Sequence, residues 1–133
     1  MGRETSANGG ELMTRDEILA AAKRKRIESH DVPELGGAVF FAVMGGVDRD
    51  RWDEEVNAEI DASKAEGRLM AARKLHALGV CLSMANEDGS RMFTDDDWPE
   101  VARWDHMLLE RLHEIVARVN VFTTRSQAEL EKN

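Results

Sequence analysis

The chain has 133 residues, enough to bury one hydrophobic core, and its 42% apolar and 33% charged residues are ordinary for a folded, helix-rich protein. The formal net charge of -8 argues against nucleic acid as a partner, because phosphate-binding surfaces need clustered basic residues. The single cysteine excludes an internal disulfide, and no apolar run is long enough to predict a membrane span.

Residues 1–12 are polar, contain glycine and show no periodicity, so we expect a disordered lead, with Met13 as a candidate functional start. A capping-box pattern follows, in which Thr14 precedes Glu17 by three residues and Met13 can pack on Ile18. It predicts a helix over about 15–26 that ends in the basic run 23–26. Four basic residues there suit the negative end of a helix dipole better than contact with nucleic acid.

A β-hairpin is predicted next, with strands over 29–34 and 38–44 and a tight turn at Gly36 and Gly37. Pro33 makes the first an edge strand, because proline cannot donate to a ladder. A two-stranded hairpin is marginal alone, so its apolar face must pack on helices or on another chain. The unpaired edge also invites a partner strand or self-association. We therefore predict partner contacts at three residues of the second strand: Val39, Phe41 and Val43.

Three helical patterns fill the rest of the predicted domain. Asp48 caps the first, which runs to about residue 64 and has one apolar face. The second covers 68–85 and is apolar around much of its circumference, so we expect the most buried helix there, with Cys81 as a core residue. The third covers 101–122, as one kinked helix or as two, with Asp105 starting the second. Its apolar stripe is favoured as core, although three of its residues are candidate partner contacts: Trp104, Leu108 and Leu112.

The acidic stretch NEDGSRMFTDDDW at 86–98 raises three hypotheses. An EF-hand calcium loop with Gly89 at its sixth position would have Met84 at the first, where an oxygen ligand is required. A catalytic pair needs a buried carboxylate, whereas consecutive aspartates in a polar turn are solvated. We therefore interpret the stretch as a turn formed by Asp88 and Gly89, followed by a helix that either Thr94 or Asp97 caps.

The histidines at positions 30, 76, 106 and 113 do not have the spacing of metal ligands, and no phosphate-binding loop or nucleophile motif occurs. We therefore expect no catalytic residue, no metal and no cofactor. The predicted fold is α+β and mainly α, with an N-terminal helix and a small β-hairpin packed on a bundle of three to four helices. The predicted domain covers residues 13–122 and is followed by a polar tail over 123–133.

Taken in order, several segments resemble the tail assembly chaperones of long, non-contractile-tailed phages. The resemblance covers about residues 16–122, although the second hairpin strand alternates less than in the family and Pro99 interrupts the helix after the turn. It rests on the order and spacing of DEILAA at 16–21, VPELGGAV at 32–39, GVDRDRW at 46–52, EDGSRMFTD at 87–95, LERL at 109–112 and RVN at 118–120.

This resemblance implies a non-enzymatic protein of the host cytoplasm that binds the tape measure protein, keeps it soluble and helps to recruit tail tube subunits. Two other classes stay open. One is a structural virion protein, such as a connector or a tail-completion protein. The other is a small metal-dependent enzyme or sensor that uses the carboxylates at 88–97.

Overall fold

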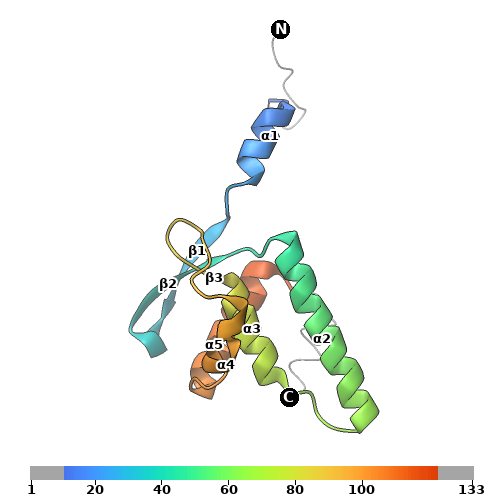
Figure 1. Ribbon diagram of the computed structural model, residues 1–133. Coiled ribbons are helices and arrows are strands. Elements are labelled where there is room, and N and C mark those ends of the chain that lie inside the picture. The colour runs from blue at the N-terminus through green and yellow to red at the C-terminus, as the bar shows by residue number, and fades with distance from the viewer. Residues whose placement is uncertain (1–10, 123–133) are drawn as a thin grey trace.

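The computed structural model describes residues 11–122, which form a mainly helical α+β fold (Figure 1). Most of the predicted lead and all of the predicted tail lie outside the described residues. The strands form one antiparallel sheet in the order β1-β2-β3. The elements in chain order are α1 (Arg15–Ala22), β1 (Ile27–Val32), the 3-10 turn η1 (Pro33–Leu35), β2 (Gly37–Ala42), α2 (Gly46–Glu66), α3 (Ala72–Ser83), β3 (Met84–Ala85), the 3-10 turn η2 (Asp95–Asp97), α4 (Trp98–Val101) and α5 (His106–Asn120).

Helix α3 is the centre of the core. It contacts α2, α4 and α5, and every residue over 77–83 is buried. A β-carbon built on Gly79 would lie 3.2 Å from Nε1 of Trp52, which donates a hydrogen bond to the carbonyl oxygen of Leu75. The missing side chain at Gly79 therefore lets Trp52 of α2 approach α3 closely. The prediction of a most buried helix is confirmed, although the helix is shorter than predicted and Leu69, in its predicted first turn, is 75% exposed.

The last helical region consists of two helices, as one of the two alternatives predicted. α4 is a single turn that tolerates Pro99 in its first turn. α5 begins after Asp105, whose Oδ1 accepts a hydrogen bond from the backbone N–H of Met107 at 2.9 Å. α5 packs on α3 and on the sheet. Its buried residues are Leu108, Leu109, Leu112, His113, Ile115, Val116, Val119 and Asn120.

The predicted hairpin forms, but the bounds of its two strands differ from the prediction and a third strand joins the sheet. Pro33 lies in η1 rather than in β1, because its fixed φ fits the first turn of a helix and not a hydrogen-bonded ladder. Gly36 has a φ of +79° and ends η1, while Gly37 begins β2. The short strand β3 pairs with β2 opposite Phe40 and Phe41. Since β3 covers that side of β2, the free edge of the sheet is β1.

Helix α1 does not pack on the bundle, and this part of the predicted fold is wrong. The capping box forms as predicted: Glu17 N–H donates to Thr14 Oγ1 at 3.2 Å, and Thr14 N–H donates to Glu17 Oε1 at 3.0 Å. The helix ends at Ala22, so the run 23–26 lies in the connection to β1. None of its residues is buried, and Figure 1 shows α1 standing away from the other elements.

Helix α2 begins earlier than predicted. Gly45 is its N-cap residue, and Asp48 lies in the first turn, where its carboxylate meets the positive end of the helix dipole. The helix ends at Gly67, which has a φ of +64°. Its buried face is narrow, as predicted, and consists of Trp52, Val56, Ile60 and Ser63.

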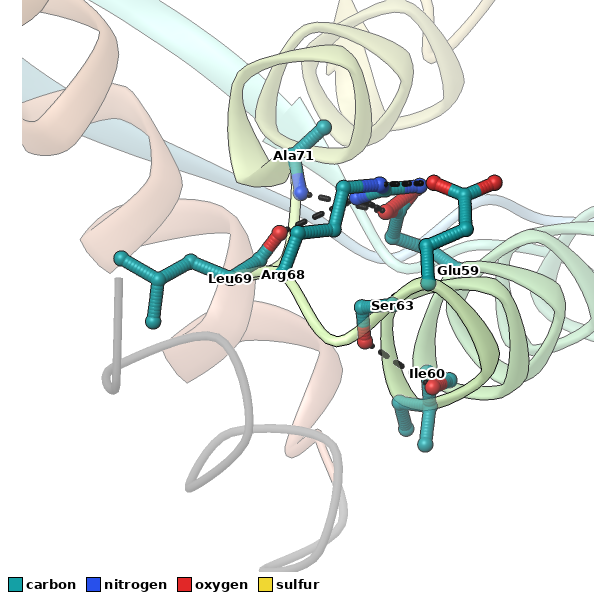
Figure 2. Close-up of polar contacts among 7 residues, drawn as sticks. Glu59, Ile60, Ser63, Arg68, Leu69 and Ala71 are labelled. Carbon is teal, nitrogen blue, oxygen red and sulfur yellow. Dashed lines mark hydrogen bonds and ion pairs between the residues drawn. The ribbon is translucent and has the colours of Figure 1, made fainter.

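The connection between α2 and α3 is fastened by a polar cluster (Figure 2). Arg68 forms ion pairs with Glu59 and Glu66, and its Nη1 also donates to the carbonyl oxygen of Leu69 at 3.0 Å. Oε1 of Glu59 accepts a hydrogen bond from the backbone N–H of Ala71 at 3.2 Å, just before α3 begins. One carboxylate therefore links the middle of α2 to the start of α3.

Candidate interaction surfaces

The most unusual surface of the chain is its N-terminal arm, which we define as residues 11–26. Four large apolar side chains of the arm are about half exposed: Leu12, Met13 and Ile18 at 51% and Leu19 at 44%. The predicted packing of Met13 on Ile18 therefore leaves half of each side chain in water. Apolar side chains clustered in this way on a folded element are typical of a surface that binds another protein.

The root of the arm is held against the body by two contacts. Val43 N–H donates to the carbonyl oxygen of Arg26 at 2.9 Å, which continues the pairing of β1 with β2. On the other side, the turn at Gly89 lies against Lys25, because a β-carbon on Gly89 would be 2.7 Å from Cβ of Lys25. The arm thus leaves the body at a fixed point and carries its apolar side chains outward.

The basic run 23–26 lacks acidic partners. Within residues 11–122, none of its four cationic side chains makes an ion pair with an acidic side chain, and all four are exposed. The arm holds five basic and three acidic residues, a net charge of +2, whereas residues 27–122 hold ten basic and twenty acidic residues, a net charge of -10. The chain is therefore electrically divided into a small basic arm and a strongly acidic body.

A shallow groove lies between α2 and α3, with a volume of about 240 Å³. Its apolar lining consists of Ala58 and Ala62 from α2 together with Ala71 and Leu75 from the start of α3. Small side chains permit the close approach of another helix. The remaining lining residues are charged: Glu55, Glu59 and Lys74. We call this site the α2–α3 groove.

The 86–98 stretch is a turn and a cap, as interpreted from the sequence. Gly89 has a φ of +87°, and Asp88 Oδ1 accepts hydrogen bonds from the backbone N–H and the hydroxyl of Ser90 at 2.9 and 2.5 Å. These hydrogen bonds lower the pKa of Asp88. Thr94 and Asp97 form a capping box around η2, and Asp97 Oδ2 accepts from Thr94 N–H at 2.7 Å. Thr94 is therefore the N-cap of η2, while Asp97 is the N-cap residue of α4 but makes no side-chain capping hydrogen bond to that helix.

Asp95 connects this stretch to the body. It pairs with Arg91 at 2.5 Å and with Arg51 of α2. Burial acts to raise the pKa of Asp95, but the hydrogen bond and charge of Arg91 and the charge of Arg51 outweigh it and lower that pKa. A carboxylate held ionised between two arginines is suited to fastening a loop, not to donating a proton.

Two stacked histidines lie between α3 and α5. The rings of His76 and His113 have centroids 3.9 Å apart, and neither Nε2 has a hydrogen-bond partner. Burial lowers the pKa of His76 to about 3, with a further contribution from His113, and burial lowers the pKa of His113 to about 4. Cys81 is fully buried, and burial raises the pKa of its thiol to about 11. Cys81 and His113 are buried and His76 is half-buried, and all three side chains are neutral at physiological pH.

The structure divides the six predicted partner contacts. Phe41 and Leu112 have no exposed surface and Leu108 has 9%, so these three side chains belong to the core and a partner cannot reach them in this structure. Val39, Val43 and Trp104 are half-buried and pack against the same core. The edge of β2 that was expected to be unpaired is paired with β3, and β2 also contacts α5.

Residues of the arm were not among the predicted partner contacts. The sequence contained one signal, the basic run 23–26 after a short helical pattern in an otherwise acidic chain. The exposure of the arm depends on how β1 is placed in the sheet. Tertiary packing determines that placement, so the sequence alone did not reveal it.

Comparison of the chain with protein-family models, with curated proteins and with solved structures finds no match in any of the three. Among residues 11–122, no helix is both long and apolar enough to cross a membrane. In the same part of the chain, no group of three or more histidine, cysteine or acidic side chains is arranged to hold a metal ion.

Proposed function

We propose that the chain is a non-enzymatic assembly chaperone of a long, non-contractile-tailed phage. Its client would be the tape measure protein, and it would help to recruit tail tube subunits in the host cytoplasm. The observation that supports this proposal most is the N-terminal arm, a capped helix with no buried residue and with exposed apolar side chains. The sequence resemblance described above supplies the identity of the client.

The arm is the surface on which we place the client. A helix of eight residues is marginal in water, so a partner that covers its apolar side chains would stabilise it. A long helical client with apolar stripes offers such a partner, because amphipathic helices bind through their apolar faces. Ile18 and Leu19, one turn into α1, are the residues we expect to be covered first.

The chemical groups of the body support binding rather than turnover. The ionised Asp95 pairs with two arginines, the Cys81 thiol is buried, and the two histidines stack on one another between α3 and α5. Each of these groups has a structural partner or a packing role. None of them combines the access and the altered pKa that a general acid, a base or a nucleophile requires.

Co-purification with the tape measure protein tests the proposal. We expect the tagged wild-type chain, co-expressed with that protein, to keep it in the soluble fraction and to recover it on affinity resin. Ile18→Asp should lose the client, because it places a carboxylate on the apolar face of α1. Val47→Asp is the matched control, since Val47 is an apolar residue at 84% exposure outside the arm.

Two outcomes would contradict the proposal. A wild-type chain that neither solubilises nor retains the tape measure protein is not its chaperone. A chain that mass spectrometry finds in stoichiometric amount in mature virions is a structural component, because an assembly chaperone leaves before maturation. Retention of the client by both aspartate variants would remove the arm from the binding surface.

A further inference from the structure

We propose that, in the free protein, the N-terminal arm of one copy docks in the α2–α3 groove of a second copy. The arm contains a folded helix with no buried residue, and four of its apolar side chains are about half exposed. The α2–α3 groove has a floor of three alanines and Leu75 between charged side chains, and its small residues accept a helix at close range. The inference deepens the proposed function by naming what occupies the arm before a client arrives.

Charge identifies a second copy as the occupant. The arm has a net charge of +2 and an unpaired basic run, while the body has a net charge of -10. Two acidic bodies repel one another, so charge favours contact of the basic arm of one copy with the acidic body of another over contact between two bodies. The start of α3 is also basic and lies near the exposed Leu69, but Arg68 and Lys74 there are already paired with acidic residues of α2.

The flank of the α2–α3 groove carries the complementary charge. Glu54 and Asp61 lie on the same side of α2 as Ala58, at spacings of four and three residues, and both are exposed. Neither makes an ion pair with a residue in the described part of the chain. With Ile18 and Leu19 in the hollow, the run 23–26 would reach these free carboxylates.

Docking within one chain is excluded by distance. Figure 1 shows α1 beyond the sheet, at the opposite end of the molecule from the connection between α2 and α3. The root of the arm is fixed by the hydrogen bond from Val43 to Arg26 and by the contact of Gly89 with Lys25. An arm held in this position meets the groove of a neighbour. When two copies exchange arms around a twofold axis, both apolar faces are covered and the assembly closes as a dimer.

The mass of the full chain in solution is the first test. Size-exclusion chromatography with light scattering at low salt should give at least twice the 14.9 kDa of one chain. Raised salt should shift the population toward the monomer, because the contact pairs opposite charges. Leu19→Asp in the arm and Ala58→Arg in the groove should each give the monomer, while Val47→Asp, matched to Leu19→Asp as an exposed apolar residue outside both surfaces, should associate like wild type.

Cross-linking between two different variants tests directly whether the arm docks in the α2–α3 groove. A mixture of Leu19→Cys and Ala58→Cys should form a disulfide-linked heterodimer on mild oxidation, whereas a mixture of Leu19→Cys and Val47→Cys should not. The native Cys81 is buried and does not compete. Circular dichroism of each variant should show wild-type helix content, which separates loss of docking from loss of folding.

A wild-type chain that is monomeric at its highest soluble concentration overturns the inference. An assembly that is unchanged by Leu19→Asp overturns the docking of the arm in the groove. The assignment of the groove is also overturned if the assembly loses mass with Leu19→Asp but neither changes with Ala58→Arg nor yields the heterodimer. The proposed function fails separately, by absence of the tape measure protein from the purified complex. A monomeric chain that still captures this client would keep the proposed function and lose the inference.

Discussion

The backbone N–H of Met44 donates a 2.7 Å hydrogen bond to Oδ1 of Asn120, 76 residues further along the chain. The amide nitrogen of Asn120 donates to Ser83 Oγ at 3.1 Å, and the Ser83 hydroxyl donates to the carbonyl oxygen of Ala42 at 2.8 Å. Arg49 in turn donates to the carbonyl oxygen of Asn120 at 2.7 Å. The side-chain amide of Asn120 therefore joins the end of α5 to α3 and to the segment after β2, while its backbone carbonyl joins α5 to α2.

Asn120→Ala should lower the free energy of unfolding by about 2–4 kcal/mol, because it leaves the buried Met44 N–H without its acceptor and removes the donor to the Ser83 hydroxyl oxygen. Urea denaturation followed by circular dichroism measures this loss. Asn57→Ala is the control, since Asn57 is exposed on α2 and should change stability by less than about 0.5 kcal/mol. Equal effects of the two substitutions would show that the buried amide is not a structural hub.

Gly89→Ala should destabilise the chain by at least about 1 kcal/mol, since a φ of +87° is unfavourable for alanine. The added methyl group would also meet the side chain of Lys25 at the root of the arm. Gly46→Ala serves as the control, because no atom lies within 4 Å of its added methyl group and its φ is not positive. Thermal unfolding that is unchanged by Gly89→Ala would mean that the turn can relax at no cost.

Local patterns in the sequence predicted the elements whose causes are local. The capping box at Thr14, the helix start at Asp105 and the turn at Gly89 depend on residues within a few positions of each other, and all three form. The broad apolar pattern around Leu78 and Cys81 likewise located the most buried helix.

Features that depend on distant partners were missed. Met84 and Ala85 continue a helical pattern in the sequence, but pairing with β2 makes them a strand. In the sequence, Phe41 resembles a residue of an exposed edge strand. In the structure it is fully buried, in a strand that contacts β3 and α5. The exposure of α1 depends on the direction in which Arg26 leaves the sheet, and the α2–α3 groove depends on how two helices lie side by side. Only three-dimensional packing determines these relationships.

Asp95→Ala should cost about 1–2 kcal/mol of stability, because it leaves Arg91 and Arg51 without their shared carboxylate. Asp96→Ala is the matched control: the neighbouring aspartate is exposed, and no ion pair joins it to another residue of the described chain. Chemical denaturation at low and at high salt measures both variants. The loss at Asp95 should persist at high salt, since the pair is partly buried. If Asp96→Ala costs as much stability as Asp95→Ala, the total negative charge of the 86–98 stretch matters for stability, and the ion pairs of Asp95 with Arg91 and Arg51 do not.

The stacked pair of His76 and His113 predicts a loss of stability in mild acid. Burial holds both folded-state pKa values, about 3 and about 4, below the ordinary 6.5. Above pH 6.5 neither state takes up a proton at these rings, so they do not change stability with pH. Below it, the unfolded chain binds protons that the folded chain excludes, and each ring therefore lowers the free energy of unfolding by up to about 1.4 kcal/mol per pH unit. Glu110 favours protonation of His76, but burial, His113 and Arg73 together outweigh it and keep the pKa low.

Substitution of one ring should flatten this dependence. Between about pH 7 and pH 5, where most carboxylates are still ionised, the free energy of unfolding of His113→Gln should fall less steeply than that of the wild type. His106→Gln is the control, because the side chain of His106 is 69% exposed. Urea titrations at several pH values across this range give the slopes. Parallel slopes for all three proteins would mean that the buried rings take up protons in the folded state as readily as in the unfolded chain.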